Sequence, residues 1–174
     1  MVQVRKDQLV NGQYYHIYTR SISKYVVFND QDEFKRIVQL LDLYQYAGFS
    51  YRYSAFLDIG STRQTEIIKG LRVDSDKIVS IVAYCIMPTH IHLLLKQNVS
   101  GGIIKYMSKV LNSYSRYFNT RHKRIGPLWA GRFKSVLVKD DEQLLYLTRY
   151  IHLNPSSANL VKFPEDWQFS SYDE

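Results

Sequence analysis

A chain of 174 residues with 45% hydrophobic composition has the length and core-forming capacity of one compact domain, which we expect to span residues 1–174. A membrane span needs roughly 18 apolar residues in succession, and the segment after Met1 lacks the apolar core of a secretion signal, so we expect a cytoplasmic protein without a membrane partner. The single cysteine, Cys85, excludes an internal disulfide and is expected to be a buried thiol, and the net charge of +7 favours a polyanionic partner.

The first third of the chain predicts a strand followed by a helix. Residues 13–20 are rich in aromatic and β-branched side chains and follow the turn pair Asn11-Gly12, which is typical of a strand. After Asn29-Asp30, apolar residues at helical spacing predict a helix that Gly48 ends.

An insertion over 49–77 follows, and its pattern leaves two alternatives open. Residues 54–59 and 65–71 are compatible with two short helices separated at Gly60-Ser61. Residues 49–56 alternate enough to form a strand instead. We expect the helical insertion.

A hairpin and a long helix occupy the middle of the chain. Residues 78–86 predict a buried strand, Met87-Pro88-Thr89 a tight turn, and residues 90–96 the antiparallel return strand. Gly101-Gly102 precedes a long amphipathic helix that we expect to end near Asn119.

The last elements are a strand and a helix. Residues 132–138 alternate as a strand. The acids Asp140-Asp141-Glu142 favour a helix N-terminus, and we expect that helix to end at the residue before Pro155. The order is therefore strand, helix, insertion, strand, strand, helix, strand, helix. It predicts an α+β, ferredoxin-like (split βαβ, RRM-like) antiparallel sheet with helices on one face, plus a C-terminal helix.

The positive charge excess is confined to one stretch, from Arg116 to Lys139. This stretch holds seven basic residues and no acid, whereas the rest of the chain has 16 of each sign. Aromatic residues lie among these cations, which suits stacking and phosphate contact with single-stranded nucleic acid, although a solvated helix face remains the simpler alternative. The candidate DNA-binding residues are Arg116, Arg121, Lys123, Arg124, Trp129, Arg132 and Lys134.

Two further patterns suggest chemistry. His90 and His92 are two apart on a predicted strand, so their imidazoles project from one face at metal-ligand spacing, although a pair of surface histidines would look the same. Tyr150 and Asn154 are four apart on the last predicted helix, which pairs a nucleophile with an oxygen ligand. A free tyrosine phenol ionises near pH 10, so attack on phosphorus needs a nearby cation or base. Taken alone, a core tyrosine is the simpler interpretation.

Together these motifs resemble the HUH single-tyrosine transposases, in the branch of the REP-associated tyrosine transposases. The resemblance covers most of the chain. The matching segments are Tyr14 to Arg20, the hairpin Ala83-Tyr84-Cys85-Ile86-Met87-Pro88-Thr89-His90-Ile91-His92-Leu93-Leu94-Leu95, the blocks Tyr117 to His122 and Leu128 to Ser135, and Tyr150-Ile151-His152-Leu153-Asn154-Pro155.

The resemblance implies a transposase that nicks and rejoins single-stranded DNA, with a hairpin structure in the DNA. Tyr150 would attack the scissile phosphate and leave a 5′-phosphotyrosine and a free 3′-OH. His90, His92 and Asn154 would hold the metal, and two imidazoles with an amide oxygen suit Mg²⁺ or Mn²⁺. Some members of the family form homodimers, so catalysis within one chain or across two chains stays open.

Three rival assignments remain from the residues. A non-catalytic single-stranded RNA/DNA-binding module with an RRM-like sheet would stack bases on exposed aromatics and would not respond to metal chelators. A metal-dependent hydrolase would use water and form no covalent adduct. Within the transposase interpretation, Tyr114 and Tyr117 are alternative nucleophiles, although neither has an oxygen ligand four residues later.

Overall fold

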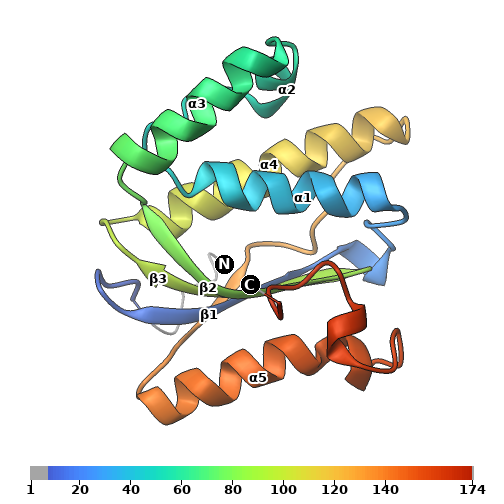
Figure 1. The fold of residues 1–174 in the computed structure, drawn as a ribbon. Coiled ribbons are helices and arrows are strands. Elements are labelled where there is room, and N and C mark those ends of the chain that lie inside the picture. Colours follow the sequence, from blue (N-terminus) through green and yellow to red (C-terminus); the bar gives the residue numbers. More distant parts are fainter. Residues whose placement is uncertain (1–7, 174) are drawn as a thin grey trace.

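The protein is a four-stranded antiparallel sheet between two layers of helices, as the computed structural model of residues 8–173 shows (Figure 1). Residues 1–7, on which the expectation of no secretion signal rests, lie outside the described residues. The elements in chain order are β1 (Tyr14–Arg20), α1 (Gln31–Tyr44), α2 (Tyr53–Leu57), α3 (Ser61–Asp74), β2 (Val79–Met87), β3 (His90–Gln97), α4 (Gly102–Arg121), β4 (Lys134–Leu137) and α5 (Asp141–Ser157), with short 3-10 turns at Ile22–Lys24 and Pro164–Asp166.

The strand order, β2-β3-β1-β4, is that of the predicted ferredoxin-like sheet. β2 and β3 form the predicted hairpin around Pro88, with Met87 opposite His90. β1 pairs with β3 on one side and with β4 on the other, so β1 and β3 are the two central strands. The histidine-bearing strand therefore lies inside the sheet.

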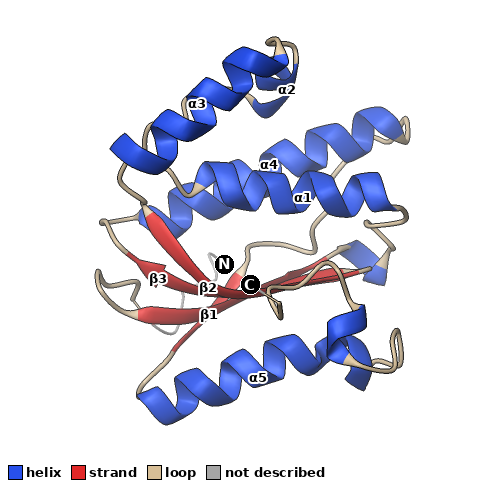
Figure 2. Cartoon of the chain, viewed as in Figure 1, coloured by secondary structure: helices blue, strands red, loops and turns tan. Residues whose placement is uncertain are grey.

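The two faces of the sheet are covered by different helices. α1 and α4 pack on one face, and α5 crosses the other (Figures 1 and 2). Successive side chains of a strand point to opposite faces, so β2 contributes Tyr84 and Ile86 to the core under α1 and α4, and Ala83, Cys85 and Met87 to a smaller core under α5. Cys85 is fully buried, as expected, and burial raises the pKa of its thiol to about 12.

Local sequence explains where the helices begin. The Asp30 carboxylate accepts a hydrogen bond from the Glu33 backbone N–H at the start of α1, and Asp140 does the same for Gln143 at the start of α5. α4 begins at Gly102, where a Cβ would lie 2.3 Å from the Ile78 carbonyl oxygen, so only glycine permits this close approach.

The insertion is helical, as predicted. α2 and α3 are separated at Asp58–Gly60, and Phe49, Tyr53 and Phe56 anchor the segment in the main core. In α3 itself only Leu71 is buried.

Two predicted boundaries are wrong. β4 spans only Lys134–Leu137 instead of 132–138, because Gly131 has a φ of +144° and the chain bends before it reaches β1. α5 does not end before Pro155 but continues to Ser157. Proline has no backbone N–H to donate, but its carbonyl can still accept a hydrogen bond. Here the Asn154 and Pro155 carbonyls accept hydrogen bonds from the backbone N–H groups of Ala158 and Leu160. The proline ring is buried.

No helix in residues 8–173 combines the length and apolar character that a bilayer crossing requires.

Candidate active site

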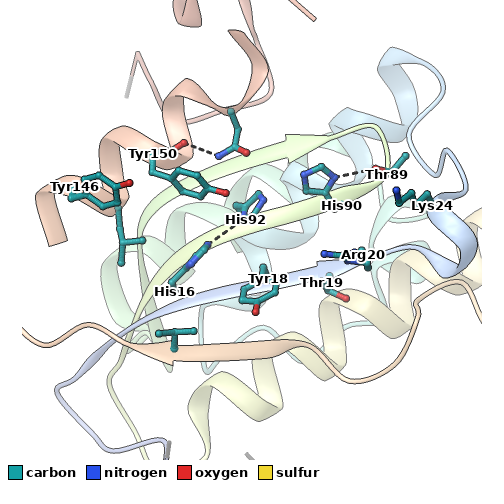
Figure 3. A pocket seen from close by; sticks show the side chains of 13 residues that line it. His16, Tyr18, Thr19, Arg20, Lys24, Thr89, His90, His92, Tyr146 and Tyr150 are labelled. Atoms are coloured by element: carbon teal, nitrogen blue, oxygen red, sulfur yellow. Dashed lines mark hydrogen bonds between the residues drawn. The ribbon is translucent and has the colours of Figure 1, made fainter. Parts of the chain in front are cut away.

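The predicted histidine pair lies at the start of β3, in a cavity of about 670 Å³ between the sheet and α5 (Figure 3). His90 and His92 point to the α5 face, because Ile91 between them is buried in the opposite core. Their ring centroids are 5.1 Å apart. The strand periodicity thus brings the two imidazoles together as the sequence predicts.

α5 brings the predicted nucleophile to the same cavity. The aromatic ring of Tyr150 lies edge-on to His92, with 5.8 Å between ring centroids, and its hydroxyl points toward that histidine in Figure 3. Asn154, one turn later, also lines the cavity, and its side-chain amide donates to the Tyr150 carbonyl oxygen at 2.7 Å. All four predicted metal and nucleophile residues therefore line one cavity.

His16 is a cavity residue that the sequence analysis missed. It lies on β1, and its Nε2 is 3.0 Å from Nδ1 of His92. Its ring is also edge-on to Tyr150, at 6.1 Å between centroids. The alternation of Tyr14, His16, Tyr18 and Arg20 on one strand face was a visible signal, but the pairing register that brings this face beside β3 was not.

Burial keeps these imidazoles neutral. Burial, together with the nearby His90, His16 and Arg20, lowers the pKa of His92 to about 3. Burial also lowers the pKa of His16 and of His90, and Arg20 adds to the effect on His90. A neutral imidazole has a free lone pair, which is the form that binds metal ions.

In both His90 and His92 the Nδ1 atom has a hydrogen-bonding partner, which leaves Nε2 as the atom that can bind a metal ion. Nδ1 of His92 contacts His16, and Nδ1 of His90 lies 3.0 Å from the Thr89 hydroxyl. Nε2 of each ring remains for an ion, and outer hydrogen bonds of this kind commonly orient metal-binding histidines. Within the described residues no group of three His, Cys, Asp or Glu could hold a metal, so any further protein ligand has to be of another type, such as the Asn154 amide.

The rival tyrosines are far from this arrangement. Tyr114, on α4, is fully buried in the main core and donates its hydroxyl to the Val27 carbonyl. Tyr117 lines a different cavity, beside α1 and α4. Tyr146, which the sequence analysis did not consider, lines the histidine cavity one turn before Tyr150 and is 67% exposed.

The seven candidate DNA-binding residues are dispersed. Arg116 and Arg121 line the second cavity on α4. Lys123 and Arg124 lie just beyond that helix, and the Arg124 guanidinium stacks on Tyr25. The indole of Trp129 donates to the Leu111 carbonyl and packs on Phe28 and Tyr114, so much of its surface is already used in the core.

Two members of the set lie in or just before β4, the strand that pairs with β1. Arg132 is exposed just before β4, and the Lys134 ammonium is 6.0 Å from the ring of Tyr18, which lines the histidine cavity. Arg20 and Lys24, absent from the predicted set, line that cavity directly. The cations that line the histidine cavity therefore come from outside the charge-rich stretch that the sequence analysis selected.

Comparison with known proteins identifies the family. The family model described as "Transposase IS200 like" matches residues 47–154, more than half of the chain. The chain belongs to the IS200-like transposase family. The matched range includes the histidine hairpin and the tyrosine helix, while β1 with His16 lies before it.

One curated relative and one solved structure are also similar to this chain. A Haemophilus influenzae protein assigned as a REP-associated tyrosine transposase is 33% identical over 101 residues, which cover 52% of this chain and 57% of that protein. The match therefore spans little more than half the length of this relative. A REP-associated tyrosine transposase solved with a bound REP hairpin superposes with a TM-score of 0.61 over 99% of this chain and 84% of the other, at 13% identity, and so shares the fold.

Proposed function

We propose that this IS200-like transposase is a metal-dependent endonuclease and strand transferase that acts on single-stranded DNA through a 5′-phosphotyrosine intermediate. The observation that carries the proposal is the position of Tyr150, whose ring contacts the rings of His92 and His16 in one cavity with His90 and Asn154. A tyrosine that served only to fill the core would not need to be 42% exposed beside three neutral imidazoles.

The metal-binding residues are His90 and His92, through Nε2 of each ring, with Asn154 as the oxygen donor. Mg²⁺ or Mn²⁺ suits this set, because both accept oxygen ligands and leave positions open for phosphate oxygens. Such an ion would act as a Lewis acid that polarises the scissile phosphate and neutralises the charge that develops on it. The Asn154 side-chain nitrogen donates to the Tyr150 carbonyl oxygen, so the side-chain oxygen of Asn154 would be the atom offered to the ion.

The reaction is a transesterification in which Tyr150 provides the nucleophilic oxygen. The phenol oxygen forms a bond to phosphorus and loses its proton, while the bond from phosphorus to the 3′ oxygen breaks and that oxygen gains a proton as the free 3′-OH. The reverse attack by another 3′-OH rejoins the strand. Because bond types are conserved, the cycle needs no nucleotide cofactor. We propose catalysis within one chain, since Tyr150 contacts its own histidines, and this holds whether or not the protein is a homodimer.

The DNA partner is a single strand with a hairpin. The solved relative was bound to such a hairpin, and this chain offers Arg20, Lys24 and Lys134 as phosphate contacts around the histidine cavity. The alternative of an RNA-binding module with an open sheet is disfavoured. α5 packs over the sheet face that such a module leaves free for bases, and the family is one of transposases.

The test is formation of a covalent protein–DNA adduct. Labelled single-stranded DNA from the flanks of the gene that encodes the chain is incubated with protein and Mg²⁺ or Mn²⁺ and resolved on a denaturing gel. Wild type should give an adduct that chelation abolishes. Tyr150→Phe should give none, whereas the matched control Tyr146→Phe, on the same helix, should keep most of it. Strand cleavage without any adduct would instead mean that water is the nucleophile.

A further inference from the structure

A second cavity of about 640 Å³ lies on the other side of the sheet from the histidines. Its walls are α1, α4 and residues 50–54 of the insertion, and α1 and α4 form the helical layer opposite α5 (Figure 1). The insertion therefore supplies one wall of this cavity, and α1 and α4 supply the others.

The lining of this second cavity is basic and contains no acidic residue. Five cations line it: Arg36, Arg52, Lys109, Arg116 and Arg121. Of these, only Arg121 forms ion pairs within residues 8–173, with Asp30 and Glu33. Arg36, Arg52, Lys109 and Arg116 therefore create a positive electrostatic potential in the cavity, which favours binding of an anion. The lowered pKa of Lys109, caused by burial and by nearby Lys105, agrees with this crowding of positive charge.

Aromatic rings and neutral donors complete the walls. The Arg36 guanidinium lies between the rings of Tyr53 and Tyr117, at 4.6 and 4.4 Å from their centroids, which holds the cation rigidly in the wall. Tyr51 is an exposed ring at the rim. Hydroxyl and amide groups add hydrogen-bond donors, from Ser50, Ser54, Ser108, Asn112, Ser113 and Thr120.

From this lining we infer that the second cavity binds the sugar-phosphate backbone of the DNA, at a position away from the cleaved phosphate. Several cations beside the exposed ring of Tyr51 suit a phosphodiester with an adjacent base better than they suit a free inorganic anion, which would use only the charges. The inference rests on the proposed function for the identity of the ligand. It assigns the insertion and Arg116 to DNA binding, and it places them outside the chemistry of Tyr150.

The experiment compares a double variant with a control of equal charge. Lys109→Gln with Arg116→Gln removes two cavity cations, and Lys69→Gln with Lys77→Gln removes two exposed lysines that lie outside the cavity lining. Affinity for hairpin DNA is measured by fluorescence anisotropy with EDTA present, so that no strand is cut. The cavity variant should lose roughly tenfold in affinity, with a salt slope smaller by about one to two, and the control should change far less.

Two more measurements separate the possible failures. Arg52→Gln alters an exposed side chain of the insertion, so it should weaken binding in the same direction without a risk to folding. At saturating DNA, the cavity variant should form the Tyr150 adduct at the wild-type rate. Equal affinities for the cavity variant and the control, while wild type still forms the adduct, would overturn this inference alone. Failure of wild type to bind DNA would overturn the proposed function and this inference with it.

Discussion

The contact between His16 and His92 determines which nitrogen of His92 can face a metal ion. If Nδ1 of His92 donates to Nε2 of His16, the lone pair of His92 lies on its Nε2 atom, and the ring cannot rotate without breaking this hydrogen bond. We therefore propose that His16 is a positioning residue, which acts on the metal through His92.

Replacement of His16 should weaken metal binding. His16→Leu removes the hydrogen-bond partner of His92 and should lower Mn²⁺ affinity by about tenfold or more, as is usual when an outer hydrogen bond to a metal-binding histidine is lost. His16→Gln retains a polar side chain of similar reach and should recover part of that affinity. Electron paramagnetic resonance of free Mn²⁺ measures this independently of DNA cleavage. Equal affinity in His16→Leu and wild type would leave His16 without this role.

At the residue scale, the sequence predicted the side chains whose spacing lies within one element. His90 and His92 share a strand face, and Tyr150 and Asn154 share a helix face, so local periodicity was sufficient to group each pair. His16 depends on how β1 aligns with β3, and nothing local encodes that register. The packing of Trp129 against Phe28 and Tyr114 was equally invisible in the sequence, because it joins segments that are far apart in the chain.

At the scale of elements, α5 is attached to the sheet by few buried residues. Ile151, the α5 residue next to the nucleophile, is fully buried in the smaller core between α5 and the sheet. Much of the rest of the helix is exposed. The position of Tyr150 over the histidines therefore depends on this contact.

Ile151→Ala should lower the free energy of unfolding by about 2–4 kcal/mol, because it leaves a cavity in a packed interface. The control Leu145→Ala, at a residue that is 62% exposed on the same helix, should cost much less. Urea unfolding followed by circular dichroism measures both. Similar losses for the two variants would mean that α5 is not held through Ile151.

The order and type of the elements could be predicted because each carries its own periodicity and its own end signals. The helical insertion followed from the spacing of its apolar residues, and the hairpin from the apolar run around Pro88. The end of α5 could not be predicted, because the outcome depended on whether the Pro155 ring would be buried, which is a property of the tertiary structure. The placement of α5 on the opposite sheet face likewise needed the whole fold.

At the scale of the whole molecule, the basic residues form two groups on opposite sides of the sheet. One lies around the histidine cavity and β4, with Arg20, Lys24 and Lys134, and the other lines the cavity beside α1 and α4. The charge-rich stretch from Arg116 to Lys139 contributes to both groups, because it passes from α4 to β4. DNA that contacts both groups would be held at the cleavage site and at a second point on the opposite side of the sheet.

Salt dependence tests the group beside β4. Neutralising Arg132 and Lys134 together, as Arg132→Gln with Lys134→Gln, should flatten the dependence of log affinity on log salt by about one to two units, since each lost phosphate contact releases one fewer counterion. The measurement is a salt titration of single-stranded DNA binding, with the Lys69 and Lys77 double variant as the control. An unchanged slope would mean that the DNA follows a path away from β4.

If Tyr150 forms the covalent bond to DNA, the peptide that carries the bound nucleotide must contain Tyr150, and identifying that peptide tests this assignment. The trapped adduct is digested with nuclease and protease, and mass spectrometry locates the remaining nucleotide. We expect a nucleotide on the peptide that contains Tyr150, attached at the phenol oxygen, and no such nucleotide in chelator-treated samples. Fragmentation has to separate Tyr150 from Tyr146, which lies one turn away in the same cavity. A nucleotide on Tyr146, Tyr117 or any other residue would mean that Tyr150 is not the nucleophile.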